Sequence, residues 1–139
     1  CATSIYGAWL VWKMGAWAGG VGLAELETRI YEWALEFQCT VRCRQTNHEG
    51  ELIDWCHDAF DWADGVIINP GAWSHYSYAI RDAVELFTVP VVEVHLSNIL
   101  EREDWRRESV LSDVVTARVI GKGPEGYREA LELLVAGAK

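Results

Sequence analysis

The apolar residues of this chain switch repeatedly between strand-like runs and a helical spacing. Residues 66–68 are a continuous apolar run, and residues 89–94 form the clearest buried strand. Between them, residues 77–86 repeat their apolar side chains with the period of a helix. Because a helix is the usual crossover between parallel strands, this alternation predicts an α/β fold with a parallel sheet.

The same spacing rules predict five strands and four helices. We expect a first strand of which residues 4–7 are the end, and further strands at residues 41–44, 66–68, 89–94 and 114–120. We expect the helices at residues 23–39, 50–62, 77–86 and 126–136. A chain of 139 residues has the size of one domain. We therefore expect residues 1–139 to form a single flavodoxin-like domain, a doubly wound five-stranded parallel sheet in three layers, α/β/α.

Composition excludes several classes of protein. The formal net charge of −9 argues against nucleic acid or an anionic membrane as a partner. No apolar run reaches the roughly 18 residues that cross a bilayer. The four cysteines, at positions 1, 39, 43 and 56, lack the spacing of a zinc site. We expect a cytoplasmic protein with reduced thiols and no bound metal ion.

Polar residues follow three of the predicted strands at the point where each strand ends. They lie in residues 45–50, 69–77 and 95–106, and include Asn, His, Glu and Arg. In doubly wound sheets, ligands bind at the loops that leave the carboxyl ends of the strands. These three segments are therefore predicted to meet at one ligand-binding edge of the sheet.

Three motifs in these segments resemble those of the type II dehydroquinases, the 3-dehydroquinate dehydratases of the shikimate pathway. They read QTNHEGELIDW from Gln45, INPGAWSHYS from Ile68 and VPVVEVHLSNILERE from Val89. The resemblance runs from about residue 23 to residue 136. It implies a flavodoxin-like fold, a homododecamer built from trimers, and a site without a metal ion or an organic cofactor.

The resemblance also implies a role for individual residues. His95 would be the general acid that protonates the leaving hydroxyl, and Glu93 would orient and charge its imidazole. Side chains of Asn69, His75 and Arg106 would hold the substrate hydroxyls, and the backbone amides of Leu96 and Ser97 its carboxylate. Asp82 would reach toward the site of a neighbouring subunit. We add Arg102, in the same segment as Arg106, as a further substrate-binding candidate.

The chemistry asks for these residue types independently of the family. A hydroxyl leaves poorly unless it is protonated, and His is the side chain whose protonation changes near neutral pH. A carboxylate on the other ring nitrogen fixes the tautomer and stabilises the imidazolium. His95 and Glu93 therefore fit acid catalysis, and we add His75 as a further catalytic candidate.

The segment after the first predicted strand departs from the family pattern. The family supplies there an Asn, a lid Arg and the Tyr that acts as general base. Residues 7–22 contain neither Arg nor Tyr, and Trp9 and Trp12 occur instead. Such a loop could line a pocket for a flatter, more apolar ligand, pack down and plug the site or join a subunit contact, or have been altered by design.

The leading hypothesis is an acid/base lyase, dehydratase or cyclase that uses His95. Its ligand would be a small carboxylate or carbonyl compound more apolar than dehydroquinate. One alternative is a true 3-dehydroquinate dehydratase with a substitute base, for which Tyr6, Tyr76 and His75 are the nearest residues. The other is a non-catalytic binding or assembly module with a tryptophan-plugged pocket.

Overall fold

Five parallel strands form one sheet at the centre of the molecule. The computed structural model describes residues 22–137 and, for the backbone alone, residues 6–13. The spatial order is β2-β1-β3-β4-β5, the flavodoxin-like order, and every neighbouring pair is parallel. The strands are β1 (Tyr6–Lys13), β2 (Cys39–Thr46), β3 (Gly65–Asn69), β4 (Val91–His95) and β5 (Ala117–Ile120). The predicted doubly wound sheet is confirmed.

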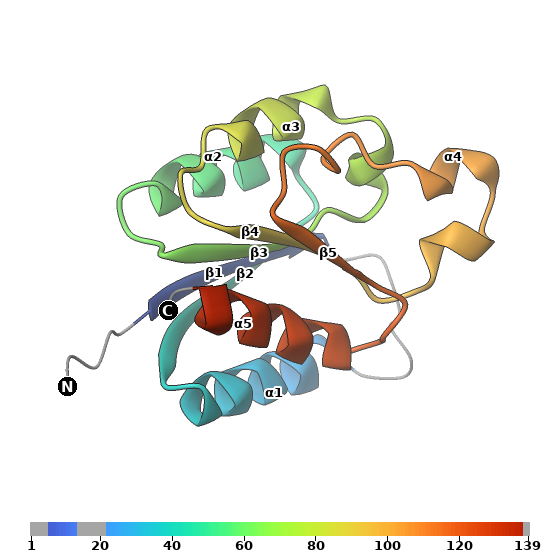
Figure 1. Ribbon diagram of the computed structural model, residues 1–139. Helices are drawn as coiled ribbons and strands as arrows, with labels where there is room; N and C mark the ends of the chain where they lie inside the picture. The colour runs from blue at the N-terminus through green and yellow to red at the C-terminus, as the bar shows by residue number, and fades with distance from the viewer. Residues whose placement is uncertain (1–5, 14–21, 138–139) are drawn as a thin grey trace.

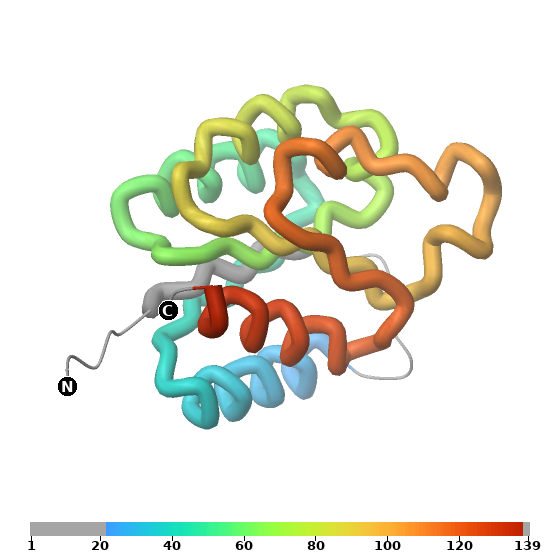
Figure 2. The backbone as a smooth tube through the Cα atoms, in the orientation of Figure 1, coloured from blue at the N-terminus to red at the C-terminus, as the bar shows by residue number. Residues whose placement is uncertain are grey.

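Helices cover both faces of the sheet, which gives three layers (Figure 1). Helices α1 (Leu23–Glu36) and α5 (Glu125–Gly137) lie side by side on one face, as the chain trace also shows (Figure 2). Helices α2 (Glu49–Ala59) and α3 (Tyr78–Glu85) pack together on the other face. The connections that the structure describes contain three short helical segments: η1 (Gly71–His75), η2 (Ile99–Glu101) and α4 (Asp104–Arg107). The sequence analysis did not predict these three.

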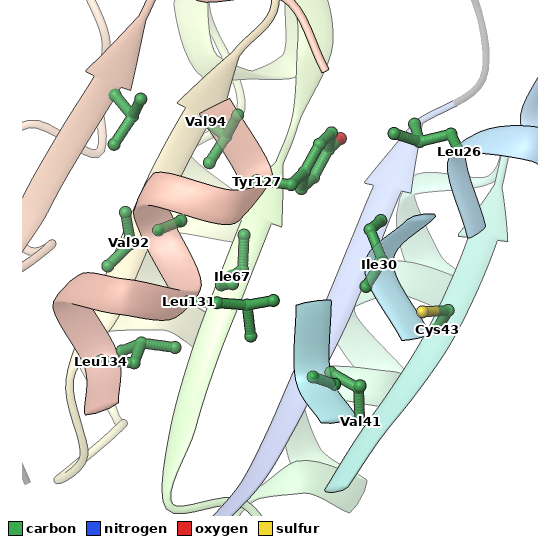
Figure 3. Packing of buried hydrophobic residues seen from close by; sticks show 13 residues of the cluster. Leu26, Ile30, Val41, Cys43, Ile67, Val92, Val94, Tyr127, Leu131 and Leu134 are labelled. Atoms are coloured by element: carbon green, nitrogen blue, oxygen red, sulfur yellow. The ribbon is translucent and has the colours of Figure 1, made fainter. Parts of the chain in front are cut away.

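Two apolar cores lie between the layers, one on each face of the sheet. In the first, Tyr127 and Leu131 of α5 face Ile67 of β3, and all three side chains are fully buried (Figure 3). In the second, Leu52 of α2 and Ile80 of α3 cover the opposite face. Strands β3 and β4 are buried along their whole length because both faces are covered, as their apolar runs predicted.

The first predicted helix ends earlier than expected, and the second strand is longer. Helix α1 stops at Glu36, and Gln38 takes a left-handed backbone conformation with φ 58°. The turn reverses the chain, so that Cys39 already belongs to β2 rather than to a helix reaching residue 39. From Cys39 to Thr46 the buried side chains largely alternate with exposed ones, and residues 41–44 are only its middle.

The first strand continues past its predicted end at Gly7. It includes Tyr6–Lys13, because the apolar stretch after Gly7 continues the strand instead of leaving it as a loop. Residues 4 and 5 of the predicted strand lie outside the described residues. The connection to α1 therefore begins only after Lys13. Residues 14–21 of that connection lie outside the described residues.

The last strand is shorter than the predicted residues 114–120. It begins at Ala117, because the preceding residues form turns closed by hydrogen bonds from Val114 N–H and Val115 N–H to the carbonyl of Leu111. Thr116 then joins the sheet through its N–H, which donates to the carbonyl of Val91. These turns bring residues 109–111 beneath the carboxyl half of β4, where the candidate site lies.

Candidate active site

The three predicted polar segments meet at the carboxyl edge of β3 and β4. Asn69 is the last residue of β3, and His95 is the last residue of β4. Helix α4 contacts both η1, which follows β3, and η2, which follows β4. In Figure 1, α4 projects from the sheet at the right of the view. The connections after neighbouring strands therefore enclose one site, as expected for this sheet topology.

A buried carboxylate–imidazole pair lies at the centre of the site. Nε2 of His95 is 2.5 Å from Oε2 of Glu93, and the two side chains are 4% and 0% exposed. A carboxylate can only accept, so Nε2 carries the proton and Nδ1 is the ring nitrogen left to exchange a proton with a ligand. This is the orientation that the sequence analysis expected for a general acid and its partner.

Two further residues bind the same carboxylate, and sequence reasoning missed both. The hydroxyl of Ser109 donates to Oε1 of Glu93 at 2.8 Å. Nε of Arg118 lies 3.6 Å from Oε2, the oxygen that His95 also contacts. Arg118 is the direct partner of Glu93 in the ladder between β4 and β5. The sequence shows Arg118 as a charged residue in an otherwise apolar strand, which could have marked it as a candidate site residue. That its partner is Glu93 follows only from the register of β4 and β5.

His75 lies beside His95 with its ring held by the backbone. Nδ1 of His75 is 2.7 Å from the carbonyl oxygen of Glu108. Since a carbonyl only accepts, Nδ1 carries the proton, and Nε2 of the neutral ring is an acceptor. The two imidazoles stack with their centroids 6.4 Å apart. The structure thus brings together the two histidines that were predicted to be catalytic.

Trp105 connects His75 to Arg106. Its ring makes an edge contact with the ring of His75 at a centroid distance of 5.3 Å. The guanidinium of Arg106 stacks on the same indole, 4.1 Å from its centroid, and its Nε is 2.6 Å from Oε2 of Glu103. An arginine so positioned at the site can bind a carboxylate or a hydroxyl. Arg102, in contrast, is exposed where η2 ends.

Asn69 contributes its amide to the fold as well as to the site. Its Nδ2 donates to the hydroxyl of Tyr127 at 3.0 Å, and its Oδ1 accepts from the N–H of Gly71 at 3.2 Å. Full burial raises the pKa of Tyr127, so that this hydroxyl stays neutral. The second N–H of the Asn69 amide is the group that remains for a ligand.

The loop that carries the two expected backbone amides is fixed from β5. The N–H of Gly121 donates to the carbonyl of His95, and the N–H of Gly123 donates to the carbonyl of Leu96, each at 3.0 Å. Leu96 is half-buried and Ser97 is exposed. The backbone N–H groups of the two glycines after the last strand therefore hold this loop in place.

Of the remaining predicted site residues, Asp82, Trp9 and Trp12, the backbone of Trp12 is the one that lies at the carboxyl edge of the sheet. Asp82 is exposed on α3. Trp12 pairs with Asn69 in the ladder, at the carboxyl edge, whereas Trp9 pairs with Val66 in the interior of the sheet. The expectation that Trp9 sits in a loop at the site is therefore wrong. The side chains of both tryptophans lie outside the described residues.

Two of the three substitute bases are poorly placed. Tyr6 begins β1 and pairs with Cys39, at the amino end of the sheet and opposite to the site. The Tyr76 side chain is 59% exposed just beyond η1. Of the three, His75 is the one with a described contact to His95.

In residues 22–137 and the strand before them, no helix is both long and apolar enough to span a bilayer. The same residues hold no group of three or more His, Cys, Asp or Glu side chains arranged to bind a metal ion.

Comparison with known proteins gives concordant matches. The family model described as "Dehydroquinase class II" matches residues 13–135. The 3-dehydroquinate dehydratase of Halalkalibacterium halodurans is 47% identical over 84% of this chain and 81% of its own length. That of Bacillus subtilis is 46% identical over 82% and 77%. The crystal structure of type II dehydroquinase from Butyrivibrio crossotus superposes with a TM-score of 0.90 at 35% identity, covering 94% of this chain and 98% of that one.

Proposed function

Because this chain belongs to the class II dehydroquinase family, we propose that it is a 3-dehydroquinate dehydratase with His95 as general acid. Its relatives over four-fifths of the chain carry that name, which favours this reading over a ligand more apolar than dehydroquinate. The observation that carries the proposal is the buried pair of His95 and Glu93 at the carboxyl edge of the sheet. The proposal also implies a role in the shikimate pathway, in the cytoplasm.

The reaction divides between the two histidines. A base removes a proton from the carbon beside the substrate carbonyl, and the electron pair forms an enolate. The enolate then re-forms the carbonyl as the C–O bond to the hydroxyl breaks, and Nδ1 of His95 gives its proton to that hydroxyl, which leaves as water. Nε2 of His95 stays bonded to Glu93 throughout, so the carboxylate stabilises the imidazolium that precedes the transfer.

His75 is our candidate for the base among the described residues. Its Nδ1 proton is held by the Glu108 carbonyl, which leaves Nε2 with a lone pair, and its ring lies against that of His95. A base and an acid must reach the same substrate from neighbouring positions, and the stacked pair satisfies this. Arg106 and the amides of Leu96 and Ser97 are proposed to bind the substrate carboxylate and hydroxyls.

The assembly is a separate part of the proposal. We propose a homododecamer built from trimers, in which Asp82 reaches the site of a neighbouring subunit. The exposed position of Asp82 on α3 is compatible with such a contact. Light scattering on the purified protein tests it, and a monomer would contradict the assembly without touching the chemistry.

Turnover of 3-dehydroquinate by the purified protein tests the function. The conjugated carbonyl of the dehydrated product absorbs in the ultraviolet, so the rate can be followed directly. We expect saturable turnover without added metal or cofactor. A folded oligomer that leaves dehydroquinate unchanged would contradict the proposal. If aromatic carboxylates then quench the tryptophan fluorescence, the result would favour a ligand more apolar than dehydroquinate. If they do not quench it, the result would favour a non-catalytic protein with a plugged pocket.

A further inference from the structure

We infer that Arg118 is a positioning residue for the reaction, one that strengthens His95 as an acid by sharing the carboxylate of Glu93 with it. This inference rests on the proposed function, since it concerns the acid step of that reaction. Arg118 lies on β5, the strand that pairs with β4.

The three groups are placed by the sheet itself. Glu93 and His95 are two residues apart on β4, so their side chains are on the same face. Arg118 is directly opposite Glu93 in the parallel ladder. Its Nε lies 3.6 Å from Oε2 of Glu93, while Nε2 of His95 lies 2.5 Å from the same oxygen. The imidazole of His95 and the guanidinium of Arg118 thus approach the same oxygen atom, one at hydrogen-bond distance and the other at ion-pair distance.

The other oxygen of Glu93 binds a different donor. Oε1 accepts the hydroxyl proton of Ser109 at 2.8 Å, and the Ser109 oxygen in turn accepts the N–H of Leu111. The carboxylate is fully buried and held from both sides. It cannot rotate to give His95 and Arg118 an oxygen each without breaking the Ser109 hydrogen bond.

The placement of Arg118 is costly for a purely structural residue. Its Nε and Nη2 are buried and make no hydrogen bond in the described part of the chain. Burying unsatisfied guanidinium N–H groups costs free energy that an apolar side chain would avoid. Within the described residues, Glu93 is the carboxylate at ion-pair distance. The arginine therefore brings a positive charge to Glu93 at a site where packing alone would favour an aliphatic residue.

That charge has a defined effect on proton transfer. The groups facing His95 are Glu93 on β4, His75 after β3 and, through Glu93, Arg118 on β5. A protonated His95 places a second positive charge beside the shared oxygen. A neighbouring cation disfavours the protonated imidazole, so Arg118 opposes the attraction of Glu93 and eases release of the proton to the leaving hydroxyl.

The test uses Arg118→Met, which keeps the length of the side chain and removes the charge, and Arg118→Lys, which restores a charge. Arg128→Met is the matched control, because Arg128 is a partly exposed arginine paired with Glu36 of α1 at 2.7 Å. Each variant is compared with the wild type for kcat and KM on 3-dehydroquinate. Each is also compared for the downfield proton resonance of the hydrogen bond between His95 and Glu93, which Glu93→Gln identifies by its disappearance.

We expect Arg118→Met to lower kcat about tenfold with KM unchanged, a fraction of what general acid catalysis contributes. Arg118→Lys should recover part of the loss, and Arg128→Met should match the wild type. In Arg118→Met the resonance should move further downfield, because Oε2 then gives its whole charge to the imidazole proton. In the Glu93→Gln background, Arg118→Met should lower kcat no further, because the arginine acts through that carboxylate.

The inference would be overturned if Arg118→Met left kcat unchanged in an active enzyme. It would also be overturned if Arg118→Met lowered kcat by the same factor in the Glu93→Gln background as in the wild type. If the wild type does not dehydrate dehydroquinate, the proposed function is wrong. The proton resonance then remains as the test of the coupling between Arg118 and the pair of Glu93 and His95. A shift in Arg118→Met that Arg118→Lys reverses would still support the coupling, and an unmoved resonance would refute it.

Discussion

Glu93 and His95 form a buried pair whose geometry follows from their spacing: they are two residues apart on β4, and Oε2 of one lies 2.5 Å from Nε2 of the other. Neutralising the carboxylate should therefore damage both activity and stability. We expect Glu93→Gln to lower kcat by about 10²- to 10⁴-fold. It should also lower the free energy of unfolding by about 1–3 kcal/mol, because Arg118 would keep its buried N–H groups and lose its ion pair.

Steady-state kinetics and urea unfolding measure these two effects. Glu36→Gln is the control, because Glu36 is an exposed carboxylate paired with Arg128. It should change the free energy of unfolding by less than about 1 kcal/mol. Equal effects of the two substitutions would contradict the role given to Glu93.

Trp105 should matter because it supports two groups of the site at once, His75 and Arg106. We expect Trp105→Ala to raise KM about tenfold, because Arg106 loses the surface on which its guanidinium stacks, a contact worth about 1 kcal/mol or more. Trp105→Phe, which keeps an aromatic face, should stay within about threefold of the wild type. Similar KM values for the alanine variant and the wild type would show that the indole does not position Arg106.

Gly121 and Gly123 offer a matched pair for testing the loop after β4. Both have positive φ, 77° and 59°, so alanine is strained at either position by about 1–3 kcal/mol. A Cβ at Gly121 would also lie 3.1 Å from Cβ of Asn98, whereas a Cβ at Gly123 meets nothing within 4 Å. We therefore expect Gly121→Ala to raise KM, by displacing the loop of Leu96 and Ser97, and Gly123→Ala to leave KM unchanged. Thermal unfolding should show a lower melting temperature for both variants. Equal KM values in the two variants would show that the loop after β4 does not contribute to substrate binding.

Two buried thiols should make the protein sensitive to alkali. Burial raises the pKa of Cys43 and of Cys56 from 9.0 to about 12. The native state thus keeps the protons that the unfolded chain releases. The resulting stability is complete below about pH 9 and is lost as the pH rises toward 12. Urea unfolding between pH 8 and pH 11 should show this decline, and Cys56→Ala should flatten it. A pH-independent free energy of unfolding across this range would contradict the burial of these thiols.

The same burial predicts slow chemical modification. In the native protein at pH 8, Cys43 and Cys56 should resist iodoacetamide, and both should react in urea. Peptide mass spectrometry distinguishes the sites. Labelling of either thiol in the native state, at the rate seen in urea, would contradict its described environment.

The central strands could be predicted from the sequence because their burial leaves a direct trace. β3 and β4 are covered on both faces, so they read as apolar runs, and Glu93 and His95 stood out in one of them. The ends of the other strands could not be read in this way. The turns before β5 contain Val114 and Val115, which look like strand residues until their backbone hydrogen bonds are known.

The site divides in the same manner. His75, His95 and Arg106 lie at or after the ends of neighbouring strands, so topology alone predicts their convergence. Arg118 and Ser109 could not be found by that rule, because they reach Glu93 through strand register and through a turn. Trp9 was misplaced because its strand was taken to end two residues before it. Sequence patterns thus predict which edge of the sheet carries the candidate site, whereas strand register determines which residues contact Glu93.

The most direct test of this account compares kcat on 3-dehydroquinate for the wild type and for His95→Ala. His57→Ala is the control, because His57 is exposed on α2 and stacks on Phe60, away from the site. We predict a loss of at least about 10²-fold for His95→Ala, with circular dichroism unchanged, and wild-type kcat for His57→Ala. A folded His95→Ala protein that dehydrates dehydroquinate at the wild-type rate would contradict the role of His95 as the general acid.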